Sequence, residues 1–143
     1  MNVEAPANDD GEHAAVSLHG ADGRAYPAQL MLEAQGDRCC LTLRWEGGTL
    51  TAAASDYFDA FAAVRRQLPS GVMPRCYGAS RNVWPSRMAR DMGQGLKAYR
   101  MTMGRQASMA DLRYIFDSGP DVEPCMPEEQ EAFFEAWLDS PRI

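Results

Sequence analysis

A strand–turn–strand–helix pattern in residues 38–68, RCCLTLRWEGGTLTAAASDYFDAFAAVRRQL, decides how this chain folds. Cys39, Leu41 and Leu43 recur with a period of two, which is typical of a half-buried strand. Residues 47–53, GGTLTAA, supply a turn and begin another short strand. The first half of the stretch therefore predicts two neighbouring antiparallel strands with one apolar face.

A helix is predicted directly after these strands. Ser55 is a suitable N-cap, and Arg65 and Arg66 in the last turn complement the helix dipole. Pro69 and Gly71 end the helix. Its apolar residues recur at helical spacing and share one face: Tyr57, Phe61, Val64 and Leu68. We expect this face to pack across the preceding sheet.

Upstream of this stretch lie two more strand-like runs, residues 14–20 (AAVSLHG) and residues 25–35 (AYPAQLMLEAQ). The sequences ADGR and GD between the runs are typical of the turns that join antiparallel strands. The prediction is an N-terminal antiparallel meander. Residues 1–11 are acidic and polar and are predicted to form a disordered arm, so that one domain spans residues 12–143.

Downstream, the pattern changes to short extended pieces. Pro85 biases the residue before it toward an extended backbone, and Ser86 is expected to cap a short helical turn that Gly93 closes. Residues 95–103 alternate as a strand does, and residues 109–117 are predicted to pair with them in a second hairpin. Residues 74–80, PRCYGAS, are predicted to form a short strand or an extended passage.

A second amphipathic helix is predicted from Pro127, a residue that suits the first helical position, to the stop at Pro141. Its apolar stripe contains Phe133, Phe134, Trp137 and Leu138. The predicted fold class is therefore α+β: an antiparallel sheet, made of the N-terminal meander plus the second hairpin, packed by two amphipathic helices.

The composition, with 45% hydrophobic and 24% charged residues, is that of a soluble globular domain. No apolar run approaches the roughly 20 residues that a membrane span needs, and the N-terminus lacks the pattern of a secretion signal. We therefore expect a cytoplasmic protein without a membrane partner. The four cysteines form no CxxC pair and are interpreted as small buried hydrophobes, so no metal or cofactor is predicted.

The charges are unevenly distributed along the chain. Residues 1–70 carry 5 basic and 10 acidic residues, residues 71–105 carry 7 and 1, and residues 106–143 carry 2 and 9. The basic residues of this middle band are Arg75, Arg81, Arg87, Arg90, Lys97, Arg100 and Arg105. Interleaved aromatic residues make a nucleic-acid or anionic-ligand module an alternative interpretation. The net negative charge of the protein argues against this alternative, because phosphate binding requires a cationic surface. We expect these arginines to pair with the acidic flanks instead.

The residues that could support catalysis are few. His13 and His19 have no nucleophile or acid nearby at a spacing that indicates a relay. Asp91 is the one acid of the basic band and is predicted to anchor a turn by pairing with a neighbouring arginine. Gly93 and Gly95 follow a helix instead of a strand, so they do not form a dinucleotide-binding loop and are expected to serve left-handed turns. No enzymatic activity is predicted.

Residues 77–124, YGASRNVWPSRMARDMGQGLKAYRMTMGRQASMADLRYIFDSGPDVEP, resemble a family of small bacterial proteins associated with Rhs and type VI secretion effectors. Members of that family show a tyrosine-glycine stretch, an NVYPSGM-RDMG-G-KAY signature and a closing D-IFDS segment. The matching signature residues here are Asn82, Val83, Trp84, Pro85, Ser86, Met88, Arg90, Asp91, Met92, Gly93, Gly95, Lys97, Ala98 and Tyr99. The preceding helix is similar too, and the resemblance covers roughly residues 50–135.

The resemblance implies an immunity protein, a non-enzymatic inhibitor that binds the C-terminal toxin domain of its cognate effector. This chain departs from the pattern at Trp84, where tyrosine is usual, and at Arg87, where glycine is usual. If position 87 requires a positive φ, Arg87 is strained. We expect the signature to hold the fold, because a surface that meets variable toxins must itself vary.

Together these arguments predict a 1:1 complex with a cognate toxin domain, with an interface of about 1,600 Å². Partner recognition is expected in the acidic C-terminal loop and helix, helped by two residues of the basic band. An effector-loading adaptor is the remaining alternative. The predicted partner-binding residues are Asp117, Asp121, Glu123, Glu128, Glu129, Trp84 and Arg87, and the predicted structural signature residues are Asn82, Pro85, Ser86, Arg90, Asp91, Gly93, Gly95 and Tyr99.

Overall fold

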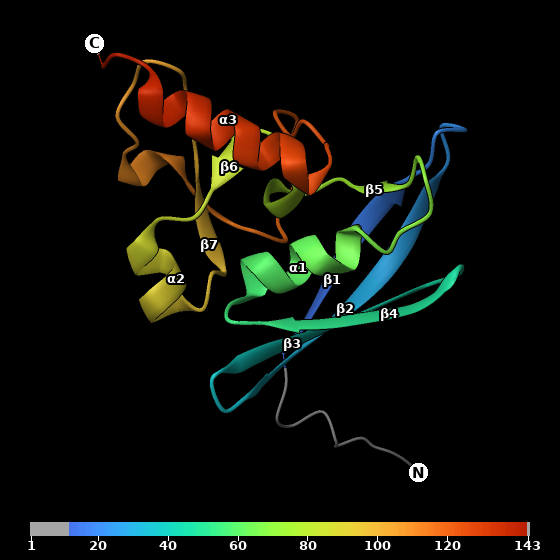
Figure 1. Ribbon diagram of the computed structural model, residues 1–143. Coiled ribbons are helices and arrows are strands. Elements are labelled where there is room, and N and C mark those ends of the chain that lie inside the picture. Colours follow the sequence, from blue (N-terminus) through green and yellow to red (C-terminus); the bar gives the residue numbers. More distant parts are fainter. Residues whose placement is uncertain (1–11, 143) are drawn as a thin grey trace.

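A computed structural model describes residues 12–142, which form an α+β fold (Figure 1). The predicted arm, residues 1–11, lies outside the described residues. The elements in chain order are β1 (Glu12–His19), β2 (Ala25–Gln35), β3 (Arg38–Trp45), β4 (Gly48–Ala54), α1 (Tyr57–Arg65), β5 (Met73–Pro74), the 3-10 turn η2 (Tyr77–Ala79), β6 (Val83–Trp84), α2 (Arg87–Gly93), β7 (Lys97–Arg100), the 3-10 turn η3 (Met109–Asp111), β8 (Leu112–Tyr114) and α3 (Pro127–Asp139).

The N-terminal meander is confirmed and forms most of a curled antiparallel sheet (Figure 1). Its strand order is β4-β3-β2-β1-β5, so β1 to β4 pair in sequence order. The register places Leu32 opposite Leu41, and Leu41 opposite Ala52. Gly36, with φ +63°, makes the tight turn between β2 and β3. The short strand β5 extends the sheet at the β1 edge.

Helix α1 packs on one face of this sheet, as predicted (Figure 1). Its N-cap is Asp56 and not Ser55: an Asp56 side-chain oxygen accepts a hydrogen bond from the Asp59 backbone N–H at 2.8 Å. The reason is that β4 continues to Ala54 and the backbone is still extended at Asp56. No described element covers the opposite sheet face, where the side chains are mostly polar or small.

A second antiparallel sheet has the strand order β6-β7-β8. It contains the predicted second hairpin, but its strands are shorter than the sequence suggests. Gly95 and Gly104, both with positive φ, flank β7 and confine it to four residues. Residues 109–117 begin with the turn η3 instead of a strand, because Ser108 and Asp111 form a capping box that starts a helical turn.

The prediction of a short strand or extended passage at residues 74–80 is partly wrong, because only Pro74 lies in a strand and the passage contains the 3-10 turn η2. Here the chain passes very close to the segment after β8, and the Gly78 backbone N–H donates to the Ile115 carbonyl at 2.7 Å. A Cβ atom at Gly78 would lie 2.9 Å from the Ile115 Cβ. Only glycine fits this approach without a shift of the backbone.

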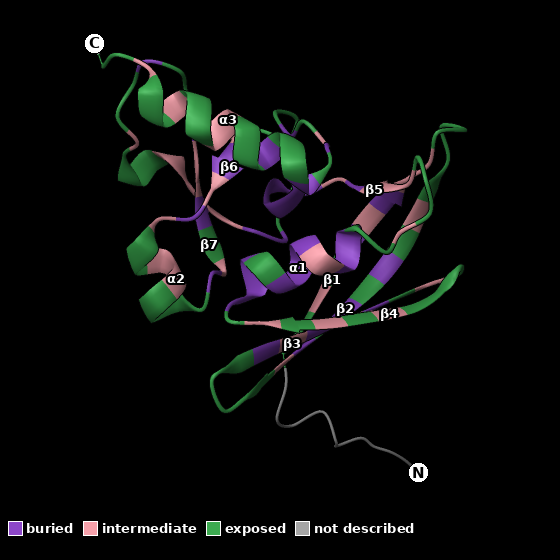
Figure 2. Cartoon of the chain, viewed as in Figure 1, coloured by how far each residue is buried: buried purple, intermediate pink, exposed green. Residues whose placement is uncertain are grey.

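One hydrophobic cluster connects the two sheets through α1 (Figure 2). It joins Leu18 and Leu30 of the large sheet, Phe61 of α1, and Val83 and Ile115 from the second half of the chain. Helix α3 lies beside β6 and, unlike α1, buries few of its residues. None of the described helices is both long and apolar enough to cross a membrane.

Candidate functional site

The predicted partner-binding acids Asp121, Glu123, Glu128 and Glu129 lie in the loop before α3 and in α3 itself, and Asp117 directly precedes that loop. We call the surface formed by residues 101–105, residues 118–126 and α3 the C-terminal face. Its parts are connected by hydrogen bonds: the Trp137 indole N–H donates to the Thr102 carbonyl at 3.1 Å, and the Gly104 backbone N–H donates to the Ser140 hydroxyl at 3.0 Å. These two hydrogen bonds join residues 101–105 to the C-terminal end of α3, and residues 118–126 lead directly into the helix.

A buried polar contact fixes α3 to the rest of the fold. Arg65 of α1 donates to the Gln130 side-chain carbonyl and to the Cys125 backbone carbonyl, both at 2.7 Å. The Gln130 amide nitrogen donates to three backbone carbonyls between Gly78 and Val83. Burial lowers the pKa of Arg65. Sequence patterns did not indicate this contact. Arg65 is already explained as a basic residue at the end of a helix, and Gln130 lies among glutamates, where an exposed side chain is expected.

Aromatic stacking adds a second connection between α3 and the signature segment (residues 82–99). Trp84 stacks on Phe134 with ring centroids 4.9 Å apart, and Phe134 stacks on Trp137 at 6.2 Å. The predicted apolar stripe of α3 therefore rests partly on Trp84, but Phe133, Phe134 and Trp137 remain only half-buried. Trp84 acts as a support for α3 and presents only part of its side chain to solvent.

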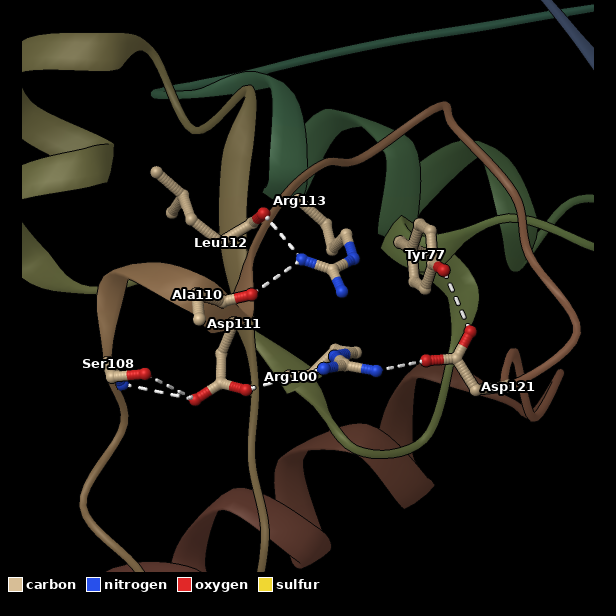
Figure 3. A network of polar contacts seen from close by, with 8 residues as sticks. All are labelled: Tyr77, Arg100, Ser108, Ala110, Asp111, Leu112, Arg113 and Asp121. Atoms are coloured by element: carbon tan, nitrogen blue, oxygen red, sulfur yellow. Dashed lines mark hydrogen bonds and ion pairs between the residues drawn. The ribbon is translucent and has the colours of Figure 1, made fainter.

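Arg100 of β7 lies at the centre of a charged network (Figure 3). Its guanidinium donates to Asp121 and forms a second ion pair with Asp111 at 3.4 Å. The Tyr77 hydroxyl donates to the other oxygen of Asp121 at 2.7 Å, and the Ser108 backbone N–H donates to Asp111 at 3.1 Å. The hydrogen bonds from Tyr77 and Arg100 lower the pKa of Asp121. The network ties η3 and the 118–126 loop to the second sheet.

A polar hollow of 310 Å³ lies next to this network. Its charged lining residues are Arg100, Asp121 and Glu123. Arg100 and Asp121 are paired with each other, and Glu123 is paired with Arg81 at 3.3 Å. Asp121, whose pKa is lowered by Tyr77 and Arg100, is a poor general base. The arrangement therefore supports a structural role for these charges.

Most of the predicted partner-binding acids make contacts within the chain. Besides Asp121 and Glu123, Glu128 pairs with Arg66 at 2.8 Å, and a Glu129 carboxylate oxygen accepts a hydrogen bond from the backbone N–H at the start of α3. The Asp117 side chain is exposed and forms no ion pair with a described residue. All five side chains are exposed. Four of the five acids thus make polar contacts within the chain.

The expected pairing of the basic band with the acidic flanks is confirmed for three arginines. Arg81 and Arg100 pair with the C-terminal flank, and Arg90 pairs with Asp56 and Asp59 at 2.7 and 3.1 Å. The other basic residues of the band, Arg75, Arg87, Lys97 and Arg105, form no ion pair with any described residue. Three of the seven basic residues of the band are therefore paired with carboxylates within the fold, and four are not.

The signature segment contributes to the fold mainly through α2 and its ends. The Ser86 hydroxyl accepts the Ala89 backbone N–H at 3.0 Å, as predicted for an N-cap. After Gly93 the left-handed position is occupied by Gln94, with φ 57°, and then by Gly95, whose hypothetical Cβ would lie 2.9 Å from the Asp56 carboxyl carbon. Gly95 is therefore required for both its backbone angle and its close approach to Asp56.

Three more signature residues support neighbouring segments. The Asn82 side-chain oxygen accepts a hydrogen bond from Ser80, and its backbone carbonyl accepts one from the Met101 N–H at 2.7 Å. Pro85 is buried between β6 and α2. The Tyr99 hydroxyl lies 3.7 Å from the Met109 sulfur. These contacts agree with the expectation that the signature holds the fold.

Another part of the signature is on the surface, which the sequence argument did not predict. Met88 and Met92 are 70% and 82% exposed, and α2 contains no buried residue. Arg87 is the first residue of α2 and has no positive φ, so the expected strain is absent there. Asp91 is exposed and does not pair with a neighbouring arginine, because Arg90 turns toward Asp56 and Asp59 instead.

The cysteines and histidines show no arrangement for metal binding. Within residues 12–142 no cluster of three or more His, Cys, Asp or Glu side chains could hold a metal ion. All four cysteines are free thiols. Burial raises the pKa of Cys76 to about 12 and that of Cys125 to about 11, so both remain neutral thiols at physiological pH. His13 is exposed on β1, and His19 lies 3.3 Å from the Ser17 hydroxyl.

Comparison with protein-family models and with curated proteins finds no match for this chain.

Proposed function

We propose that this protein is an immunity protein that binds and neutralises the C-terminal toxin domain of a cognate Rhs or type VI secretion effector. It acts by steric or electrostatic blockade, without catalysis, as one copy per toxin domain. Two lines support the proposal: the resemblance of the signature segment to that family, and the chemistry of the C-terminal face. The acidic surface of α3 is the observation that carries it.

Helix α3 contains five acidic residues and no basic residue. The acids are Glu128, Glu129, Glu131, Glu135 and Asp139, and all of them are exposed. They surround half-buried aromatic side chains that are held in fixed positions by stacking. Rigid aromatic residues contribute binding energy at a protein interface, and a surface of one charge accelerates association with a partner of opposite charge. This combination suits a basic toxin surface.

The nucleic-acid alternative receives less support from the structure. The arginines that could have formed a cationic strip are divided between ion pairs, since Arg81, Arg90 and Arg100 each pair with at least one carboxylate. A phosphate backbone would have to displace those carboxylates. It would also have to approach a protein with a net charge of −6.

Co-expression with the neighbouring toxin gene tests the proposal. We expect cells that produce the toxin domain to survive when this protein is present, and the purified proteins to form a 1:1 complex with an interface of about 1,600 Å². Replacing Glu135 and Asp139 by lysine places two positive charges on α3 and is expected to weaken the complex at least tenfold. Equal killing with and without the protein would refute the proposal.

The same experiment separates immunity from an effector-loading role. An adaptor would bind the full effector but not the isolated C-terminal toxin domain, and it would leave the toxin active. Mixing the purified toxin domain with this protein therefore decides between the two. Inhibition of the isolated domain is the result expected of an immunity protein.

A further inference from the structure

An apolar groove runs along one side of α3. It has a volume of 490 Å³ and is lined by Arg81, Met103, Glu129, Ala132, Phe133 and Ala136. The α3 members come from successive turns of the helix, so the groove extends along the helix and not across it. Figure 2 shows that the outward side of α3 is exposed over most of its length.

The shape of the groove comes from small residues beside large ones. Ala132 and Ala136 lie four residues apart on one side of α3 and form a flat floor. Met103, 42% exposed, lines it from the 101–105 segment, and Phe133 lines it from α3. A row of small side chains lets another helix approach closely, because it leaves a groove for the ridges of a partner.

The walls of the groove are held in place before any partner binds. The Trp137 indole N–H donates to the carbonyls of Thr102 and Arg105, which fixes the segment that carries Met103. On the other side, the Arg81 guanidinium stacks over the Phe133 ring at 5.3 Å. A preformed groove reduces the entropy that binding must overcome.

The charge next to the groove is negative. Glu128, Glu135 and Asp139 share one face of α3, at spacings of seven and four residues, and form an acidic ridge beside the alanine floor. Basic side chains are present nearby as well: Arg66 pairs with Glu128 of the ridge at 2.8 Å, Arg81 is paired with Glu123, and Arg142 stacks over Trp137 at 4.1 Å. The other two acids of the ridge, Glu135 and Asp139, form no ion pair with a described residue. Arg105 is exposed at the 101–105 segment. The ridge itself contains no basic residue.

We propose that this groove docks an amphipathic basic helix of the partner. The helix lies along α3, inserts a large apolar side chain over Ala132 and Ala136 against Met103, and sets its lysine or arginine residues against the acidic ridge. Recognition of this kind uses apolar anchors spaced by three or four residues and a flexible methionine that adapts to them. The inference rests on the proposed function only for the identity of the partner, a toxin domain.

A designed peptide tests the groove without the toxin. The probe is an 18-residue amphipathic helix (roughly five turns) of leucine and lysine, titrated into protein labelled with ¹³C at the methionine methyl groups. We expect the Met103 methyl signal to shift at saturation. The signal of Met31, which is 38% exposed on the open face of the large sheet, is the matched control and stays in place. A peptide with glutamate in place of lysine is expected not to bind.

Substitutions on α3 distinguish the contribution of the groove's shape to peptide binding from the contribution of its charge. Ala136→Gln fills the groove without changing the charge and is expected to raise the Kd for the leucine–lysine peptide about tenfold. Leu138→Gln introduces the same residue on the other side of α3, where the side chain is 55% exposed, and changes the Kd less than twofold. The pair Glu135→Gln and Asp139→Asn weakens binding about threefold to tenfold, and the loss disappears at high salt.

The outcomes distinguish this inference from the proposed function. If the Met103 signal does not move, or if the glutamate peptide binds equally well, the groove is not a docking site for a basic helix. If Ala136→Gln protein still protects cells from the toxin as wild-type does, immunity stands and the groove inference fails. If the peptide binds at the groove while the toxin domain is neither bound nor inhibited, the groove stands and the proposed function fails.

Discussion

At the scale of single residues, Gln130 has an unexpected position, because it lies on an acidic helix and its side chain is almost fully buried. It accepts a hydrogen bond from Arg65 and donates to backbone carbonyls of the η2 segment. Arg65 is buried without a carboxylate, and its acceptors are carbonyl and amide oxygens. Each partner therefore depends on the other, since an unsatisfied buried polar group is costly.

We predict that Gln130→Leu destabilises the protein by about 3 kcal/mol, because the change leaves an Arg65 N–H and several carbonyl groups without partners. Urea unfolding followed by circular dichroism measures the loss. Glu131→Leu changes the neighbouring exposed residue and is expected to shift the free energy of unfolding by less than about 0.5 kcal/mol. If the two variants unfold at the same urea concentration, the polar contact does not hold α3.

Residue spacing explains which parts of the candidate site could be predicted from the sequence alone. The Ser86 cap and the position of Pro127 follow from local rules, and both are present in the structure. The partners of Arg65 and Arg90 are distant in sequence. The chain contains many other carboxylates, and spacing alone does not show which of them an arginine contacts. A local pattern therefore predicted that arginines would be neutralised, but it could not select Asp56 over Asp91 as the partner of Arg90.

At the scale of elements, Arg100 connects two irregular segments to the second sheet. The η3 turn and the 118–126 loop meet β7 through Asp111 and Asp121 (Figure 3). We predict that Asp121→Asn lowers stability by about 1 kcal/mol, since the pair is partly exposed, and accelerates hydrogen exchange in residues 118–124. Mass spectrometry after deuterium labelling measures this. Asp117→Asn is the control, and equal exchange in both variants would contradict the assignment.

The two edges of the large sheet are protected differently. Strand β5 is only two residues long and ends at Pro74, which gives that edge little capacity to pair with another strand. Strand β4 has seven residues without charge or proline. Its outer carbonyls are covered by side chains: Gln67 donates to the Thr51 carbonyl at 3.0 Å, and Arg38 donates to the Ala53 carbonyl at 3.1 Å.

We predict that the double variant Arg38→Ala, Gln67→Ala self-associates, because it frees an uncharged strand edge for pairing with a second copy. Sedimentation velocity between 10 and 200 μM (on the order of the concentrations at which exposed strand edges promote association) measures the shift. Arg44→Ala removes a charge from the exposed face of the same sheet and leaves β4 covered. If that control associates to the same degree, loss of charge and not the open edge is responsible.

At the scale of the whole molecule, the sequence predicted the architecture better than the boundaries. The long strands and the helix after them could be predicted, because each of these elements buries only one of its two faces. Burial of one face gives a strand its strict period of two and a helix its apolar stripe. The second half was harder to predict, because its strands have two to four residues and depend on contacts with distant segments. The isolated bridge between Ser80 and Pro124 is one example that no local pattern indicates.

Two buried cysteines and one buried tyrosine, all protonated at neutral pH, predict how the stability of the whole fold changes at high pH. Burial raises the pKa of Cys76 from 9.0 to about 12, that of Cys125 from 9.0 to about 11, and that of Tyr57 from 10.0 to about 12. Below pH 9 these groups are protonated in both the folded and the unfolded state. Above pH 9 the unfolded chain loses these protons first, and the folded protein keeps them. The free energy of unfolding therefore falls as pH rises from 9 toward 12.

We expect the midpoint of urea unfolding, measured under reducing conditions, to be nearly constant from pH 7 to about pH 8 and to decrease steadily above pH 9. The Cys76→Ala, Cys125→Ala variant is less stable at neutral pH, because it loses buried volume. Its stability declines less between pH 9 and pH 10, because it lacks the two thiols whose protons the unfolded wild-type chain loses and the folded protein keeps over that interval. Parallel curves for the two proteins over that interval would show that the buried thiols do not control the alkaline transition.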